Sequence, residues 1–420
     1  MLKILQRGWA LRLSWFALAV VLWPGLASAQ SDATAPTPLV QAGMPTDWLF
    51  VFKFNGSAFS SKDIADRPCP FGGTAQPYKL FGQQYVFATN ANPTLVQGAG
   101  LLGTSDNDPV GATFGEIYNS SLHYVVWNDQ PYGHPHITGC GENCEIPWGH
   151  SKGVLAWNEA GEGLVLQVST PSWPLAGRKD HPRIGDGNTL GCVQFKNDVA
   201  VSQHFFALRL TRSDVAAVLA ALVNASVGTD IHNAGLTDNG GPPEIQALVQ
   251  QLGVRSSSVK PTMATLSSGI RLISKPSNLN VPPWQMVSAL LGGIDMRVAN
   301  WWTVPKIYST DSASRIDCWD PSLPKPGGVE IALHGHWQNK TFGLSGIPTN
   351  GNHAKIGVST APASSITVFG DENQQGALTG KCASSQNGRG GLFFVVDNAP
   401  LHAAVSDLIA GDTAPLSPAQ

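Results

Sequence analysis

Two copies of the tripeptide His-x-Lys carry the residues whose types and spacing best suit catalysis. They are His150-Ser151-Lys152 and His353-Ala354-Lys355, and alternating apolar residues follow each of them. Residues i and i+2 of a β-strand point to the same face, so each copy is predicted to aim one imidazole and one ammonium at a common point. An imidazole attacks or transfers protons near neutral pH, and an ammonium binds phosphate oxygens. Two such strands facing each other would form a site able to cut a phosphodiester through a phosphohistidine.

A second cluster could bind a metal ion instead. His134, His136, Cys140 and Cys144 offer two imidazoles and two thiols at a spacing found in zinc sites. The two cysteines can also bond to each other, and an oxidising compartment favours the disulfide. We expect the disulfide and no metal. A zinc-dependent hydrolase, or a zinc-stabilised module that binds carbohydrate or a partner, is the alternative interpretation.

The first 29 residues predict export. Lys3, Arg7 and Arg12 form a basic region, residues 15–22 are apolar, and Ala27-Ser28-Ala29 is a small-residue cleavage site, so we expect a signal peptide. The apolar run is short for a bilayer span, and no later segment approaches the length needed. The expected product is periplasmic or secreted, has no membrane anchor and contains disulfides.

The charge of the chain limits how it could bind nucleic acid. The formal net charge is −3, and loss of the three basic residues of the leader changes it to −6. A protein of this charge must bind DNA through a local basic cleft rather than through its overall field. Eleven histidines would add positive charge below about pH 6.5, so a polyanionic substrate is favoured in acid.

Length and composition predict two fused halves rich in strands and loops. The 391 residues after the leader exceed one ordinary core, and the chain has 45 glycines, 30 prolines and 13% charged residues. We expect an N-terminal half over residues 30–230, a connecting segment over 231–260 and a C-terminal half over 261–420. Patterning predicts strands at 48–54, 85–88, 123–127, 150–157, 164–168, 191–195, 205–210, 329–333, 366–369 and 393–396, and helices at 213–223, 244–252, 284–291 and 401–409. The strand at each His-x-Lys tripeptide is expected to form a hairpin with the next strand, 164–168 after the first motif and 366–369 after the second.

Ordered segments along the chain resemble the deoxyribonuclease II family, which belongs to the phospholipase D superfamily. Besides the two tripeptides, the similar segments are 45–48, 51–53, 127–131, 149–155, 169–171, 274–275, 370–373 and 388–391. The chain departs from the family pattern at Val168, where a histidine is frequent, and at Gln374, where an arginine usually stands. Both departures concern DNA contacts and efficiency rather than the two motifs.

The resemblance implies an α/β fold of two phospholipase D-like halves related by a pseudo-twofold axis. Each half would be a mixed β-sheet flanked by helices, and the active site would lie on the axis. It also implies an endonuclease that cuts double-stranded DNA without metal, favours acid and leaves 3′-phosphate ends. One histidine would attack phosphorus and the other would protonate the leaving oxygen, while Lys152 and Lys355 hold the phosphate. The superfamily favours His150 as nucleophile and His353 as general acid.

Three further side chains are predicted to contact the phosphate. Asn128 and Asn373 are candidates for orienting amides, although asparagine in such positions also shapes turns. Ser169 is the third candidate. Asp129 and Asp371 are expected to brace loops or histidines rather than to carry protons.

One alternative function remains within the same superfamily. An exported phosphodiesterase could act on lipid head groups, although an acidic chain without an apolar amphipathic segment argues against a membrane substrate. The sequence leaves open whether the chain forms a homodimer.

Overall fold

The computed structural model describes residues 35–59, 82–103, 106–131, 136–171, 200–346 and 351–417. Residues 35–420 form one compact unit. The predicted signal peptide, Cys69, His134, Cys192 and the predicted strand at 191–195 lie outside the described residues. No helix among the described residues is long and apolar enough to cross a membrane.

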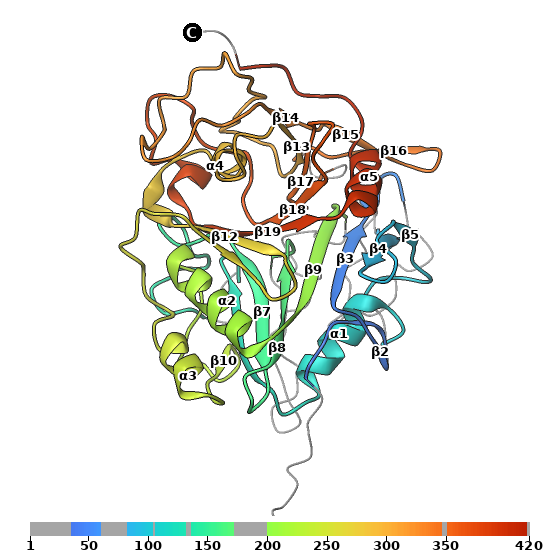
Figure 1. Cartoon of the computed structure of the whole chain (residues 1–420), viewed down its shortest axis with the longest axis vertical. Helices are drawn as coiled ribbons and strands as arrows, with labels where there is room; N and C mark the ends of the chain where they lie inside the picture. Colours follow the sequence, from blue (N-terminus) through green and yellow to red (C-terminus); the bar gives the residue numbers. More distant parts are fainter. Residues whose placement is uncertain are drawn as a thin grey trace, which may run out of the picture. The chain divides into compact units, whose positions relative to one another are not determined.

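The first sheet has eight strands, and all of its strand pairs are antiparallel. The strand order is β10-β6-β7-β8-β9-β3-β4-β5 (Figure 1). The predicted hairpin after the first motif is confirmed as β7 and β8. The strands are β3 (Trp48–Lys53), β4 (Tyr85–Thr89), β5 (Val96–Gln97), β6 (His123–Asn128), β7 (Lys152–Trp157), β8 (Gly163–Val168), β9 (Gln203–Leu210) and β10 (Thr237–Asp238), and a separate ribbon pairs β1 (Leu39–Gln41) with β2 (Met44–Pro45).

The second sheet has seven strands in the order β11-β12-β19-β18-β17-β13-β14, and only β13 and β14 pair in parallel. The predicted hairpin after the second motif is confirmed as β17 and β18. The strands are β11 (Thr262–Thr265), β12 (Arg271–Lys275), β13 (Met296–Ala299), β14 (Val329–Ile331), β17 (Ile356–Ser359), β18 (Ile366–Gly370) and β19 (Gly391–Asp397), and a separate ribbon pairs β15 (His334–Trp337) with β16 (Lys340–Gly343).

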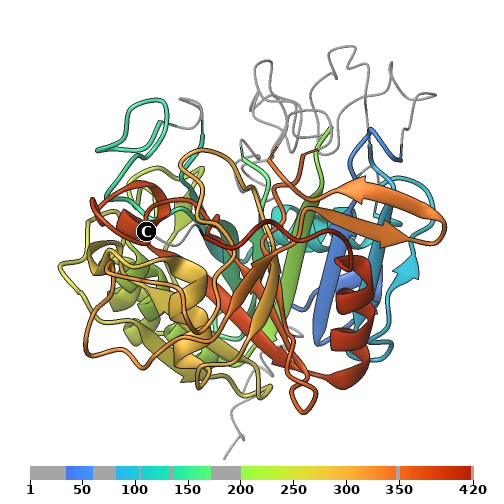
Figure 2. The same cartoon turned by 90° about the horizontal axis from the view of Figure 1, so that it is seen from above.

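The described chain has five α-helices and two 3-10 turns alongside the sheets, so the predicted α/β class with mixed sheets is confirmed. The helix α2 packs against strands of both sheets, and α5 lies beside the β15–β16 ribbon (Figures 1 and 2). The helical elements are α1 (Pro109–Tyr118), α2 (Arg212–Ala225), α3 (Pro243–Val249), η2 (Ser277–Leu279), α4 (Pro283–Leu290), η3 (Ser385–Gly388) and α5 (Ala399–Leu408).

The strand orders of the two sheets correspond around the motifs. In both sheets, the strand at a His-x-Lys tripeptide (β7 or β17) lies beside its hairpin partner (β8 or β18). That partner in turn lies beside a strand from later in the chain, so the series β6-β7-β8-β9-β3 corresponds to β13-β17-β18-β19-β12. The pseudo-twofold axis and the boundaries at residues 230 and 260 stay predictions. Part of the predicted connection is built into the first sheet, because β10 pairs with β6.

The two sheets share a hydrophobic core, which explains the long apolar runs in their strands. Phe50 and Phe206 of the first sheet stack on Phe369 of the second, with ring centroids 4.4 and 4.7 Å apart. The alternate residues of β3, Leu49 and Val51, pack in a separate cluster that includes residues of α1. Strands covered on both faces need apolar side chains at successive positions rather than at every second one.

Local signals fix the ends of several elements. Thr211 caps α2 through a capping box with Asp214, so the helix starts slightly earlier than predicted. Helix α1 was not predicted, although Asp108 caps it and Pro109 occupies its first turn. Glycines at positions 111 and 115 weaken its helical pattern.

Two disulfides are present among the described cysteines. Cys140 bonds to Cys144 and Cys318 bonds to Cys382. The predicted bond between Cys140 and Cys144 is therefore confirmed.

Candidate active site

The two His-x-Lys tripeptides lie where the two sheets meet. Strand β7 begins two residues after His150, and β17 begins three residues after His353. The prediction that both histidines lie within strands is wrong, because their backbone N–H groups bond across to the other half. His150 donates to the carbonyl of Gly390 at 2.7 Å, and His353 donates to the carbonyl of Ser202 at 2.8 Å. The backbone of each histidine is thus bonded to a residue that immediately precedes a strand of the other sheet, β19 for His150 and β9 for His353.

Glycine at positions 149 and 390 allows the segment before the first motif and the turn before β19 to approach the end of α2 closely. A Cβ atom on Gly390 would lie 2.2 Å from the carbonyl oxygen of Ala225, and one on Gly149 would lie 2.7 Å from the same atom. Neither position can therefore accept a larger residue without movement of the backbone.

The ring of His150 is buried and has a fixed orientation. Its Nδ1 lies 2.8 Å from the carbonyl oxygen of Asp371. A carbonyl only accepts hydrogen bonds, so Nδ1 carries the proton and the neutral ring keeps its lone pair on Nε2. Burial lowers the pKa of His150 well below its ordinary value; the Asp129 charge opposes this shift, and the Lys152 and Lys355 charges add to it. The neutral form of His150 is therefore favoured to lower pH than that of an exposed histidine.

Asp129 joins the lysine of the first motif to an arginine of the second half. Lys152 Nζ lies 2.5 Å from Asp129 Oδ1, and Arg389 Nη2 lies 2.9 Å from Asp129 Oδ2. Burial opposes ionisation of Asp129, but the Lys152 and Arg389 charges outweigh it and hold the pKa of this carboxyl below its ordinary value. Arg389 also donates to the carbonyl groups of Trp148, Cys144 and Gly149.

Arg389 was not predicted as a site residue. The only signal was its place in the family-like segment 388–391. Its role depends on contacts with residues 129–149, which no local pattern could have indicated.

The second histidine has a different partner at Nδ1. Gln203 Nε2 lies 3.2 Å from His353 Nδ1, and the Ser169 hydroxyl donates to Gln203 Oε1 at 2.7 Å. With this orientation the amide is the donor, so Nδ1 of His353 accepts and Nε2 of the neutral ring carries the proton. The indole of Trp301 meets the imidazole edge-on at 4.4 Å between centroids.

A buried chain of hydrogen bonds connects the two motifs. Asp371, whose carbonyl binds His150, accepts from Gln167 Nε2 at 3.0 Å. Gln167 Oε1 lies 3.5 Å from His204 Nε2, and His204 Nδ1 accepts from the backbone N–H of Lys355 at 3.2 Å. Burial and the Lys355 charge lower the pKa of His204 to about 3. Because Lys355 also lowers the pKa of His150, the lysine of the second motif acts electrostatically on the histidine of the first.

The three predicted phosphate-contacting residues differ in how their polar atoms are used. Asn128 is buried beside Lys152 in the β6–β7 pair, its Oδ1 accepts from Gln130, and its Nδ2 has no hydrogen-bond partner among the described residues. Asn373 uses its amide to donate to Gln375 Oε1 at 3.0 Å. Ser169 bonds to Gln203. Asn128 is thus the one of these three whose donor has no protein partner in the described part of the chain.

The two residues that depart from the family pattern are packed inside the protein. Val168 belongs to the core cluster on one face of the first sheet. Gln374 is fully buried and donates to Gln285 Oε1 at 2.9 Å.

The zinc alternative loses its two thiols in this structure, because Cys140 and Cys144 are bonded to each other. A group of three or more His, Cys, Asp or Glu side chains arranged to hold a metal ion is absent among the described residues.

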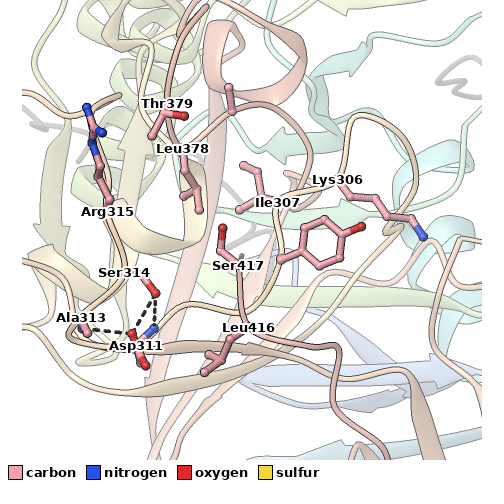
Figure 3. Close-up of a pocket in the computed structure, with 12 residues that line it drawn as sticks. Lys306, Ile307, Asp311, Ala313, Ser314, Arg315, Leu378, Thr379, Leu416 and Ser417 are labelled. Carbon is pink, nitrogen blue, oxygen red and sulfur yellow. Dashed lines mark hydrogen bonds between the residues drawn. The ribbon is translucent and has the colours of Figure 1, made fainter. Parts of the chain in front are cut away.

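A cavity of about 600 Å³ opens elsewhere, and none of the predicted site residues line it. Loop residues 306–315 form one wall, and residues 377–379 and 416–417 complete it (Figure 3). Asp311 accepts hydrogen bonds from Ala313 and Ser314 in this wall, which fold the loop on itself.

The two sheets of this α/β fold bring their His-x-Lys tripeptides to one interface. This arrangement fits the class of hydrolases that cut phosphodiesters. The family model of deoxyribonuclease II matches residues 70–412. The chain belongs to this family of DNA-degrading nucleases. A comparison with curated proteins found no match.

Proposed function

We propose that this chain is a secreted acid endonuclease that hydrolyses double-stranded DNA without a metal ion. It acts through a phosphohistidine and leaves 3′-phosphate ends. The observation that supports the proposal most strongly is that both histidines are positioned by hydrogen bonds from distant parts of the chain. His150 bonds to Asp371 and Gly390, and His353 bonds to Ser202 and Gln203. Two histidines with no catalytic task in common would not need to be positioned across one interface.

In the first step, Nε2 of His150 attacks phosphorus, and the bond from phosphorus to the 5′-oxygen breaks. His353 gives a proton to that oxygen, so the leaving strand departs as an alcohol. Lys152, Lys355 and the amide of Asn128 bind the nonbridging oxygens while negative charge accumulates there. The Nδ1–H of His150 points at a carbonyl and therefore supports attack from Nε2.

In the second step, His353 has given up its Nε2 proton, is neutral with a hydrogen on Nδ1, and takes a proton from water at Nε2. The resulting hydroxide attacks phosphorus, the phosphorus–nitrogen bond breaks and the 3′-phosphate is released. His150 returns to its starting state, and the proton on His353 serves the next cycle.

The acid preference follows from the two histidines having different protonation states. His353 must be protonated to act as general acid, whereas His150 must be neutral. The lowered pKa of His150 lets it stay neutral where His353 is charged. Secretion is supported by the leader-like residues 1–29 and by the two disulfides.

Cleavage of supercoiled plasmid at about pH 5 and about pH 7.5, each with and without excess EDTA, tests this proposal. We expect faster cleavage at the lower pH and no loss with chelator, because lysines rather than metal ions neutralise the phosphate. The products should accept label at the 5′ end directly and at the 3′ end only after phosphatase treatment. Loss of cleavage in EDTA that added magnesium or zinc restores would overturn the proposed mechanism.

A further inference from the structure

The side chain of Gln203 is positioned to serve His353 in two protonation states. It lies at the start of β9, is fully buried, and stands between the hydroxyl of Ser169 and Nδ1 of His353. An amide presents a donor on one side and an acceptor on the other, so rotation by half a turn exchanges them without changing its shape.

The described arrangement suits a neutral His353. Ser169 donates to Gln203 Oε1, Gln203 Nε2 donates to His353 Nδ1, and the Ser169 oxygen accepts from the backbone N–H of His204 at 2.8 Å. A general acid, however, must first be protonated, and Nδ1 then also carries a hydrogen. Two donors would face each other unless the amide turns.

The reversed arrangement is equally well satisfied. Gln203 Oε1 would accept from Nδ1–H of His353, and Nε2 would donate to the Ser169 oxygen. The hydroxyl hydrogen of Ser169 could then turn to the carbonyl of His204, which lies 3.3 Å from Oγ. A serine oxygen can accept two hydrogen bonds and donate one, so Ser169, Gln203 and Nδ1 of His353 all remain hydrogen-bonded to one another in this arrangement.

We propose that Gln203, held by Ser169, is a positioning residue that reverses its amide when the resting, neutral His353 is protonated to become the general acid. This inference rests on the proposed function, since it gives His353 the role of general acid. It also gives Ser169 a role different from the predicted phosphate contact, because Ser169 acts on the reaction through Gln203.

Other groups near His353 contribute to the electrostatic environment in which the Gln203 amide acts. Trp301, from the segment after β13, meets the ring of His353, and His204 from β9 accepts from the backbone N–H of Lys355, two residues further along the chain. Trp301 carries no charge, and the pKa of His204 is lowered by its burial, so that ring is neutral at working pH. An acceptor at Nδ1 favours the protonated form of an imidazole.

The test compares the pH dependence of plasmid cleavage in Gln203→Glu and Gln203→Met. A carboxylate can only accept, so Gln203→Glu should move the upper limb of the profile to higher pH by about one unit or more. Methionine offers neither donor nor acceptor of similar strength, so Gln203→Met should move the same limb to lower pH. The exposed Gln251→Glu change adds the same charge away from the site and should leave the profile unchanged.

A direct measurement keeps the inference independent of folding defects. The titration of His353, followed by NMR of histidine-labelled protein and assigned by its loss in His353→Ala, should shift in the same two directions. Unchanged titration midpoints in both folded variants would overturn the amide reversal. If His353→Ala itself cleaved DNA normally, the proposed function would fail instead, so the two failures are distinguishable.

Discussion

At the scale of single residues, the two histidines differ at Nδ1. His150 faces a backbone carbonyl, and His353 faces the amide of Gln203. The first partner leaves the lone pair of a neutral ring on Nε2, which suits a nucleophile. The second partner is an amide, which can present an acceptor to a protonated ring, and this suits a residue that must be protonated before it donates. These contacts support the assignment of His150 as nucleophile and His353 as general acid.

Replacing either histidine by alanine should remove nearly all cleavage. In the proposed mechanism the two residues act as a unit, so His150→Ala and His353→Ala should each lower the rate by about 10⁴-fold or more, and the double variant should be little worse. Single-turnover rates with plasmid DNA measure these effects. Two partial losses that multiply in the double variant would mean that the histidines do not act together.

Rapid quenching in alkaline detergent separates the roles of the two histidines, because a phosphohistidine survives alkali better than acid. With 5′-labelled DNA, His353→Ala should retain label on the protein and His150→Ala should not. Label on His150→Ala alone would exchange the two roles.

At the scale of secondary-structure elements, the turn before β19 fixes the first motif. Arg389 contributes one ion pair with Asp129 and three hydrogen bonds to backbone carbonyls, and its side chain is 8% exposed. The arginine therefore links the turn after η3 to the loop that enters β7. The equivalent support of the second motif comes from the start of β9, through Ser202 and Gln203.

Arg389→Met should destabilise the protein and impair cleavage. The change keeps an apolar stem but leaves the Asp129 charge with Lys152 as its remaining strong partner, so the free energy of unfolding should fall by about 3–5 kcal/mol. Denaturant titration measures this loss. Arg315→Met breaks only an exposed pair with Asp317 and should cost about 0–1 kcal/mol. Similar losses in the two variants would contradict a structural role for Arg389.

At the scale of the whole molecule, buried ionisable groups determine how stability varies with pH. Burial raises the pKa of Asp371 to about 7 and that of Glu372 to about 8, and it lowers the pKa of His204 to about 3. The stabilisation linked to the two carboxyls is complete in acid and is lost as pH rises towards 7–8. The stabilisation linked to His204 is complete above about pH 6.5 and is lost as pH falls towards 3. Stability should therefore be greatest in weak acid.

Glu372→Gln tests the alkaline side of this dependence. Glutamine keeps the shape of the neutral carboxyl but does not ionise, so the variant should gain stability relative to the parent between about pH 5 and pH 9, by several kcal/mol at about 1.4 kcal/mol per unit of pKa shift. Denaturant titrations across this range measure the difference. Glu145→Gln, at an exposed position, should show no comparable gain. A constant difference for Glu372→Gln at all pH values would show that this carboxyl is ionised throughout.

The sequence by itself determined the two His-x-Lys motifs, most strands around them and the hairpins that follow. These features depend on neighbours along the chain: the period of apolar residues, the turn after β7 and the capping residues of helices. The segments that resemble the deoxyribonuclease II family also predicted the class of reaction. The asparagines, in contrast, could not be distinguished by local pattern, and only the structure shows that the amide of Asn373 is engaged by Gln375 while that of Asn128 is not.

The tertiary structure decided how the motifs are held. Asp371 lies 221 residues from His150, Gln203 lies 150 residues from His353, and Arg389 lies 260 residues from Asp129. Contacts at such separations arise because two apolar sheets pack face to face and bring the loops at their edges together. A strand's own period carries no information about the loop that will meet it, and so the partners of both histidines became visible only in the fold.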